Sequence, residues 1–447
     1  MIMKKFLKIQ MLAVLLAAFT LSACDSDEDD KVDEVMTNTI VDVAVGSDDF
    51  SVLVEAVTRV GLVDALADPN ASLTVFAPTD AAFSALLTEL GASSLDDISD
   101  ELLTSVLLYH VLGEQMTATQ LSDGYYSTLS AGPAEGLNLS LYKNGLMLND
   151  RAEITTANVM ADNGVIHVID KVILPLSITG HAVANSSFSS LVAAVVKAEL
   201  DETLASDDVR FTVFAPVNSA FDQLLTDLGV TLDDLTAEAL SPILLYHVLD
   251  GVNPSSSVTA GYFPTLATAF EKNVSLGIST DDGVVLNGSS NVAVVDVVAT
   301  NGVIHAIDEV LLQPNIVDVA LSNPAFSILV EAVVKAELVD ALSGDGPLTV
   351  FAPTNAAFEA LFETLEVDGI ADLDVTLLTS VLLSHVVSGN VVSGDLSSSS
   401  VPTLNTEKSI DVVVNGGVSL DGDINVVLAD VQTKNGVIHV IDGVILP

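Results

Sequence analysis

One eight-residue string appears three times in this chain of 447 residues, at 163–170, 301–308 and 435–442. Each copy reads Asn-Gly-Val-Ile-His, then Val or Ala, then Ile-Asp. Asn and Gly tolerate the positive φ of a tight hairpin, so the pair predicts a turn. The residues after it alternate between two sides that are both mostly apolar, which is typical of a strand covered on both faces. The string therefore predicts a hairpin and a buried strand whose histidine lies among core residues.

Two further strings recur in step with the first and define a large repeat. A strand-and-turn string rich in Phe, Ala and Pro comes earlier, and an apolar helix-like segment lies between the two, at 74–83 and 107–112, 212–221 and 244–249, and 349–358 and 382–387. Phe76, Phe214 and Phe351 are separated by 138 and 137 positions. Solenoid repeats are about 20–50 residues long, so this period is that of a whole domain. We predict three tandem domains, at 37–175, 176–314 and 315–447.

Within each domain the pattern changes from helical to strand-like. The apolar residues at positions 50, 53, 54 and 57 follow the spacing of one helix face. Asp80 is a favourable N-cap residue, so we expect it to cap the next helix, and a third apolar helix is expected over 102–112. Short strands separated by Asn-Gly and Asp-Gly turns follow. Helices first and strands last predict an α+β fold.

The three strings, in this order, resemble the sequence boxes of the fasciclin-type adhesion domain, and they cover essentially all of the chain after residue 36. The resemblance implies that each domain is a β-sandwich or wedge with helices packed on it. It also implies adhesion, and in animal relatives of this family the region around a Tyr-His pair is implicated in that role. Carried over, it marks the candidate interaction residues Tyr109, His110, Tyr246, His247 and His385. The third domain departs from the pattern because Ser384 replaces the tyrosine.

The repeated histidines invite comparison with metal and catalytic sites. A zinc site usually needs three or four ligands, whereas each domain offers two repeated histidines and no thiol. No Gly-x-Ser-x-Gly elbow, glycine-rich phosphate loop, His-Glu-x-x-His string or EF-hand loop is present in the sequence. We therefore predict a non-enzymatic protein without catalytic residues, cofactor or metal. A structural role is expected for the histidine and aspartate of each recurring strand: His167, Asp170, His305, Asp308, His439 and Asp442.

Residues 1–24 are typical of a bacterial lipoprotein signal peptide. Three lysines precede an apolar stretch at 11–21, which is shorter than the roughly 20 residues of a membrane span. The segment ends in Leu-Ser-Ala-Cys, which places small residues before a thiol able to carry a lipid. That thiol belongs to Cys24, the only cysteine in the sequence, so no intramolecular disulfide is possible. Residues 25–36 are strongly acidic and predict a solvated tether.

The formal net charge of −47 narrows the choice of partners. Phosphate binding needs basic patches, so the composition excludes nucleic acid. We expect a protein lipid-anchored in the cell envelope, at the outer membrane or cell surface, although the aspartate after Cys24 leaves inner-membrane retention open. Three weak sites would bind a surface protein, a matrix component or a polysaccharide with avidity. The alternative is capture of a small molecule, lipid or polysaccharide, which requires a deep apolar cavity between helices and sheet.

Overall fold

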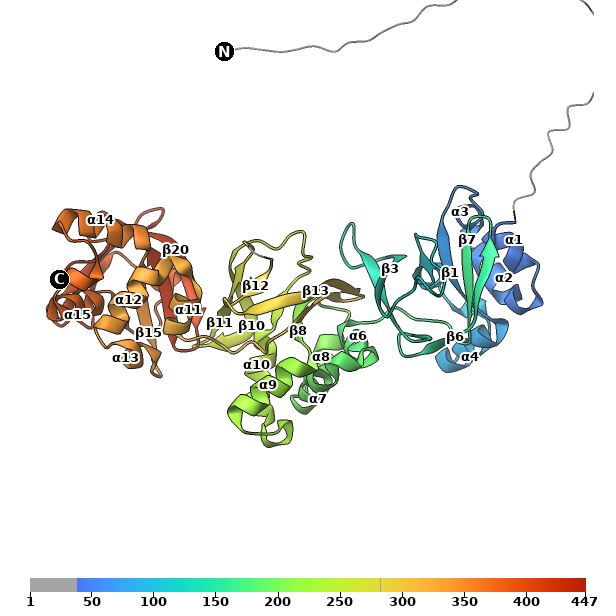
Figure 1. Ribbon diagram of the computed structural model, residues 1–447, viewed down its shortest axis with the longest axis horizontal. Helices are drawn as coiled ribbons and strands as arrows, with labels where there is room; N and C mark the ends of the chain where they lie inside the picture. Colours follow the sequence, from blue (N-terminus) through green and yellow to red (C-terminus); the bar gives the residue numbers. More distant parts are fainter. Residues whose placement is uncertain (1–37, 282) are drawn as a thin grey trace, which may run out of the picture. The chain divides into compact units, whose positions relative to one another are not determined.

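The computed structural model describes residues 38–447 except Asp282, and Figure 1 shows their helices and strands. The predicted signal peptide with Cys24 and the whole predicted acidic tether, residues 25–36, lie outside the described residues. Three units repeat the same order of elements, with helices first and strands last. The first unit consists of α1 (Ile40–Val45), α2 (Ser51–Arg59), α3 (Val63–Leu66), β1 (Leu73–Pro78), α4 (Asp80–Leu90), α5 (Asp100–Tyr109), β2 (Val111–Leu112), β3 (Gly124–Ala131), β4 (Asn138–Asn144), β5 (Met147–Leu148), β6 (Ala152–Ala161) and β7 (Gly164–Ile169).

The second and third units keep this order, which confirms the α+β class. The second unit consists of α6 (Ile178–Ala184), α7 (Ser189–Lys197), α8 (Asp201–Ala205), β8 (Phe211–Pro216), α9 (Asn218–Leu228), α10 (Ala237–Tyr246), β9 (Val248–Asp250), β10 (Gly261–Ala269), β11 (Lys272–Ser279), β12 (Val285–Leu286), β13 (Ser290–Ala299) and β14 (Gly302–Ile307). The third unit consists of α11 (Ile316–Ser322), α12 (Ser327–Lys335), α13 (Val339–Ser343), β15 (Leu348–Pro353), α14 (Asn355–Leu365), α15 (Val375–Ser384), β16 (Val386–Ser388), β17 (Ser399–Pro402), β18 (Ser409–Val414), β19 (Val418–Leu420), β20 (Ile424–Thr433) and β21 (Gly436–Ile441). Short 3-10 turns precede α2, α5 and their counterparts.

The strands of each unit form one seven-stranded sheet. In the first unit each strand pairs antiparallel with the next along the chain, and β7 then pairs parallel with β1, which closes the sheet. The second unit closes in the same way, whereas in the third β16 and β17 are not paired and the sheet stays open. The resemblance implied a sandwich or wedge with packed helices, and the structure realises it as a barrel-like sheet that is closed in the first two units and open in the third.

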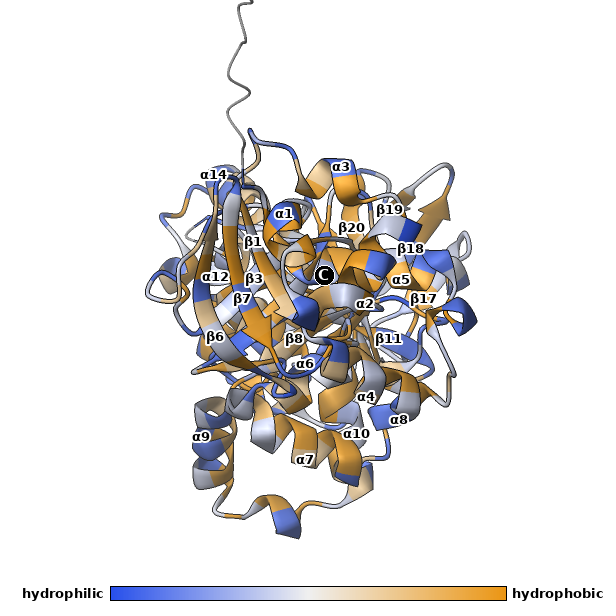
Figure 2. Ribbon diagram, turned by 90° about the vertical axis from the view of Figure 1, so that its right-hand side faces the viewer, coloured by the Kyte–Doolittle hydropathy of each residue, from blue (hydrophilic) through white to orange (hydrophobic). Residues whose placement is uncertain are grey.

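Buried apolar residues fill two regions of each unit. In the first unit one region lies between helices and sheet and includes Phe83 and Ile166, and the other lies among the strands and includes Phe76 and Leu148. The last strand of each unit is buried almost throughout, as predicted from its two apolar faces. Figure 2 accordingly shows β1 and β7 as predominantly hydrophobic.

The hairpin before β7 differs from the expected one. Ala161 pairs with Gly164, so Asp162 and Asn163 form the turn, and neither of them has a positive φ. Glycine is required at 164 for another reason: a Cβ there would overlap the carbonyl oxygen of Leu73 on the parallel strand β1. The Asn-Gly pair is therefore set by close packing of two strands and by the buried amide described below.

Two helix boundaries also correct the sequence analysis. Thr79 rather than Asp80 caps α4, because the Thr79 hydroxyl accepts a hydrogen bond from the Ala82 N–H. The Asp80 carboxylate instead accepts a hydrogen bond from the Val52 N–H, at 2.8 Å, and so caps the neighbouring helix α2. The third helix ends at Tyr109, since the following Val-Leu pair forms strand β2.

Within residues 38–447, Asp282 aside, no single helix is long and apolar enough to span a membrane. The segments Ile316–Ser322 and Pro324–Lys335 meet the length and composition criteria only as a pair, and that pair is bent by 107°.

Candidate functional site

A buried asparagine holds the first and third helices of each unit against the sheet. The Oδ1 of Asn163 accepts a hydrogen bond from the Ile40 N–H at 2.9 Å, and its Nδ2 donates to the carbonyls of Leu66 and Asp68 at 2.8 and 3.0 Å. These bonds satisfy an N–H at the start of α1 and carbonyls at the end of α3, which no helix can satisfy internally. Asn301 and Asn435 make the same three bonds in the other units.

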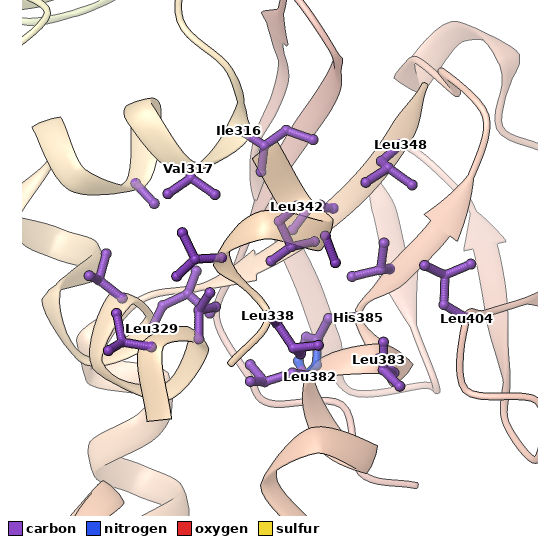
Figure 3. A pocket seen from close by; sticks show the side chains of 18 of the residues that line it. Ile316, Val317, Leu329, Leu338, Leu342, Leu348, Leu382, Leu383, His385 and Leu404 are labelled. Carbon is purple, nitrogen blue, oxygen red and sulfur yellow. The ribbon is translucent and has the colours of Figure 1, made fainter. Parts of the chain in front are cut away.

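The helices held in this way enclose an apolar pocket that recurs in all three units. Its volume is about 140 Å³ in the first unit, about 300 Å³ in the second and about 200 Å³ in the third. Figure 3 shows the third pocket, whose wall combines Ile316 and Val317 from α11, Leu329 from α12 and Leu342 from α13. The strand β15 and the end of α15 close it from behind, with His385 among the lining residues.

An exposed aliphatic side chain stands at the same place on the rim of each pocket. Val45, Val183 and Leu321 line the three pockets at equivalent positions, each 138 residues apart, and are 63%, 65% and 63% exposed. This position was not predicted from the sequence, because on the first helix it continues an apolar pattern that is typical of core residues. The sequence feature that indicates this position is the excess of apolar residues on a helix of six or seven residues. Such a short helix has only one buried face, so some of its apolar side chains must be exposed.

A fully buried histidine connects the back of the pocket to the end of the unit. His110 caps the C-terminus of α5, with its Nδ1 2.6 Å from the Val106 carbonyl oxygen, and its Nε2 accepts a hydrogen bond from the Ile173 N–H at 3.0 Å. Because Nε2 accepts, the proton of the neutral ring is on Nδ1. Burial lowers the pKa of His110 to about 4, and His247 and His385 have the same partners and the same lowered pKa.

The tyrosine before this histidine lies on the other side of the helix, among the strands. The Tyr109 hydroxyl donates to the Ser140 carbonyl oxygen at 2.6 Å and accepts from the Asn149 Nδ2 at 2.9 Å. Tyr246 makes the equivalent bonds, and burial raises the pKa of both phenols. In the third unit the Ser384 hydroxyl instead donates to the Ser380 carbonyl oxygen at 2.9 Å and accepts from the Asn405 Nδ2 at 2.9 Å. There the asparagine is replaced by Asp421, which pairs with Lys408 at 2.9 Å, so the loss of the hydroxyl is matched by a charged pair.

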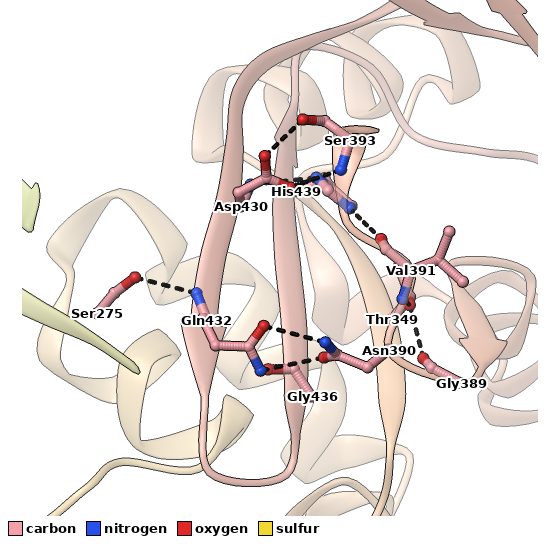
Figure 4. Close-up of polar contacts among 10 residues, drawn as sticks. All are labelled: Ser275, Thr349, Gly389, Asn390, Val391, Ser393, Asp430, Gln432, Gly436 and His439. Carbon is pink, nitrogen blue, oxygen red and sulfur yellow. Dashed lines mark hydrogen bonds and ion pairs between the residues drawn. The ribbon is translucent and has the colours of Figure 1, made fainter. Parts of the chain in front are cut away.

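The histidine of each recurring strand is also buried and has both ring nitrogens paired. In the third unit, drawn in Figure 4, His439 Nε2 lies 2.9 Å from the Val391 carbonyl oxygen and Nδ1 accepts from the Asp430 N–H at 3.3 Å. His167 and His305 are bonded in the same way. The aspartates three positions later accept backbone N–H bonds at 2.6 to 2.7 Å, which joins the ends of two strands: Asp170 from Glu153, Asp308 from Asn291 and Asp442 from Asn425.

These positions bear directly on the candidate interaction residues. Tyr109 and Tyr246 are 0% exposed, and His110, His247 and His385 are each 2% exposed. The folded unit therefore covers these five side chains, and their polar atoms are already bonded within it. Three of them, the histidines, line the apolar pocket instead. Within the described ranges no group of three or more His, Cys, Asp or Glu side chains is placed to hold a metal ion.

A family model described as the Fasciclin domain matches residues 48–175, 186–313 and 324–447. The chain is 30% identical to periostin of Homo sapiens over 388 residues, which cover 84% of this chain and 44% of periostin. It is 42% identical to Protein sll1483 of Synechocystis over 137 residues, 31% of this chain and 73% of that protein. It is 34% identical over 120 residues to the cell surface glycolipoprotein MPB83 of Mycobacterium bovis, 26% of this chain and 49% of that protein.

A solved structure of a FAS1 domain pair from the insect cell adhesion molecule fasciclin I is 20% identical, covers 58% of this chain and 95% of that chain, and has a TM-score of 0.38. The chain spans less than half the length of the animal relatives it matches, 44% of periostin and 42% of the porcine transforming growth factor-beta-induced protein ig-h3.

Proposed function

Because this chain belongs to the fasciclin domain family, we propose that it is an adhesion protein presenting three modules, 37–175, 176–314 and 315–447, from the cell envelope. The family is non-enzymatic, in agreement with the sequence analysis. Our proposal assigns binding of a surface protein, a matrix component or a polysaccharide to the three modules together.

The observation that carries the proposal is the recurrence of one exposed apolar feature in every module. Val45, Val183 and Leu321 occupy the same place beside the same pocket, so whatever one module binds, the others are equipped to bind. Three linked copies of a weak site raise the overall affinity by a factor on the order of 10²–10⁴ when they engage the same surface. This suits attachment to a surface on which the partner is repeated.

Anchoring through Cys24 is part of the proposal and concerns a residue outside the described range. It is supported by the signal-peptide pattern and by the similarity to the cell surface glycolipoprotein MPB83 of Mycobacterium bovis. We propose a lipid-anchored protein of the outer membrane or cell surface. In cells labelled with a clickable palmitate analogue, the wild-type chain should carry the label and sediment with membranes. Cys24→Ser should lose the label and appear in the soluble fraction; a variant that still sediments and labels would exclude this anchor.

Capture of a small molecule or lipid is the alternative from the sequence analysis, and it calls for a deep cavity. The pockets measure about 140 to 300 Å³. Small-molecule sites usually measure about 300–1,000 Å³, so the pockets are at or below the lower limit. This supports adhesion over capture as the main role.

Binding by several modules has a direct test. The chain from Asp25 onward would be immobilised, and envelope and matrix fractions would be passed over it, in parallel with versions lacking each module in turn. Avidity predicts that every deletion lowers retention of the same component at least tenfold. If no deletion changes retention, or if one module alone accounts for all of it, cooperation among modules is excluded.

A further inference from the structure

We propose that the pocket under α1, α6 and α11 receives an aliphatic or aromatic side chain of a partner protein, with a lysine or arginine of the partner beside it. This inference rests on the proposed binding function and identifies the surface and the chemistry through which each module binds.

The lining of the pocket fixes the first requirement, an occupant without polar groups. In the first and third units the side chains around it are almost all aliphatic, and both ring nitrogens of the histidine at the back are bonded to backbone groups. Thr58, the remaining polar residue of the first pocket, donates its hydroxyl hydrogen to the Val54 carbonyl oxygen. A charged or hydrogen-bonding group placed here would lose its hydration without gaining a partner.

The size of the pocket fixes the second requirement. A cavity of about 150 Å³ lined by aliphatic and aromatic side chains accommodates one benzene molecule. The three pockets, at about 140 to 300 Å³, are thus suited to one side chain such as Leu or Phe. Binding energy at protein interfaces is concentrated in such anchors, which fill a pocket and are surrounded by contacts that exclude water.

The rim indicates that the occupant belongs to a larger surface. Val45, Val183 and Leu321 are about two-thirds exposed, and Val196 and Val334 add 55% and 58% exposed side chains in the second and third units. A pocket with an apolar rim offers more contact area than the occupant alone would use. A partner protein supplies both the anchor and the surface around it.

Charge selects among proteins. An exposed acid occurs at the same place on the third helix of each unit, at Asp64, Glu202 and Asp340, and Glu202 itself lines the second pocket. The whole chain carries −47, so a second copy or an anionic lipid would be repelled. Basic residues beside the anchor of the partner would be attracted by the negative charge of this chain. This favours a partner in which a hydrophobic anchor lies next to Lys or Arg.

The test uses methyl NMR spectra of the chain from Asp25 onward, with defined peptides as probes. The acetylated and amidated peptide Gly-Lys-Gly-Leu-Gly-Lys-Gly, and its Phe counterpart, should shift the methyl signals of Val45, Val183 and Leu321 in a saturable manner. Replacing the central residue by Ser should abolish the shifts, and replacing both lysines by Glu should weaken binding at least fivefold. Shifts that persist with the Ser peptide, or equal binding of the Glu peptide, would overturn the proposal.

Matched variants show whether the pocket is responsible. An alanine lines all three pockets at the same position, so Ala44→Phe, Ala182→Phe and Ala320→Phe together should fill them and weaken the Leu peptide at least tenfold. The control places the same phenyl groups on exposed alanines of α4 and α14 outside the pockets, Ala85→Phe and Ala360→Phe, and should bind normally. Unchanged binding by the filled variant refutes the proposal.

A second set of variants avoids any effect on packing. Asp64→Lys, Glu202→Lys and Asp340→Lys change exposed groups only, and together they should reverse the preference, so that the Glu peptide binds more tightly than the Lys peptide. Hexanol shifting the pocket signals while no peptide does so would identify a small-molecule site and refute a protein anchor. If the wild-type chain and the triple Ala→Phe variant retain a partner equally, the pocket inference is refuted and the proposed adhesion function stands. If the peptides bind but no partner is retained, the adhesion function is refuted and the pocket inference stands.

Discussion

Replacing Asn435 by alanine tests the main structural claim, that one amide holds two helices onto the sheet. The side chain is 2% exposed and makes three bonds to backbone: from the Ile316 N–H at 2.9 Å, and to the Leu342 and Gly344 carbonyl oxygens at 2.9 and 2.8 Å. Alanine removes all three and leaves a buried N–H and two carbonyls without this partner.

The expected loss follows from these bonds. A neutral hydrogen bond contributes about 1 kcal/mol net, and a buried group left unpaired costs about 1–3 kcal/mol. Three bonds, of which those at Ile316 and Leu342 are buried and the one at Gly344 is partly buried, give on the order of 3–4 kcal/mol for the third unit. That is at the upper end of single-substitution effects, and it is a large part of the stability of a domain this size, since native domains are stable by about 5–15 kcal/mol.

Urea unfolding followed by far-ultraviolet circular dichroism, with amide hydrogen exchange read by segment, measures this loss. With a slope of about 2 kcal/mol per molar urea, the midpoint of the third unit should fall by roughly 1.5–2 M. Exchange should accelerate over 316–344 and stay unchanged in 38–175. Asn415→Ala, at an exposed turn, is the control and should change little. A midpoint shift below about 0.5 M would refute the clamp.

Three further predictions concern the buried polar groups and the close strand pair. Acidification from pH 6.5 to about 4 should destabilise each unit, because burial lowers the pKa of His110, His247 and His385 to about 4, whereas these histidines take up protons near pH 6.5 in the unfolded chain. The free energy of unfolding should be highest above pH 6.5 and fall by about 3 kcal/mol per histidine as the pH is lowered to about 4. The melting temperature measured against pH tests this. Gly436→Ala should lower the free energy of unfolding by several kcal/mol, because the added Cβ would overlap the Leu348 carbonyl oxygen. Gly369→Ala is the control and should be nearly neutral, because the space around Gly369 is open. Equal unfolding midpoints for the two variants would contradict the packing argument. Tyr109→Phe should cost about 1–3 kcal/mol through the unpaired Ser140 carbonyl and Asn149 amide, seen as faster exchange in the first unit only.

Much of the architecture was accessible from the sequence because it depends on local patterns. The spacing of apolar residues in 50–57 predicted α2, and the alternation after Gly164 predicted a strand buried on both faces. The structural role assigned to His167 and Asp170 is consistent with their bonds, which run to backbone groups of their own unit. The burial of the Tyr-His side chains was not accessible from the resemblance, because a resemblance indicates that a segment matters without saying which of its atoms are accessible.

The sequence by itself determined how many modules there are, their α+β class and which strand is buried, because these follow from repeats and from periods of 3.6 and 2 residues. Only the tertiary structure decided that Asn163 clamps helices 123 and 97 positions away, and that three short helices leave an apolar pocket with an exposed rim. The physical reason is range. A periodic pattern specifies which side of an element avoids water, whereas the partner of a buried amide and the gaps between packed helices depend on where distant elements meet.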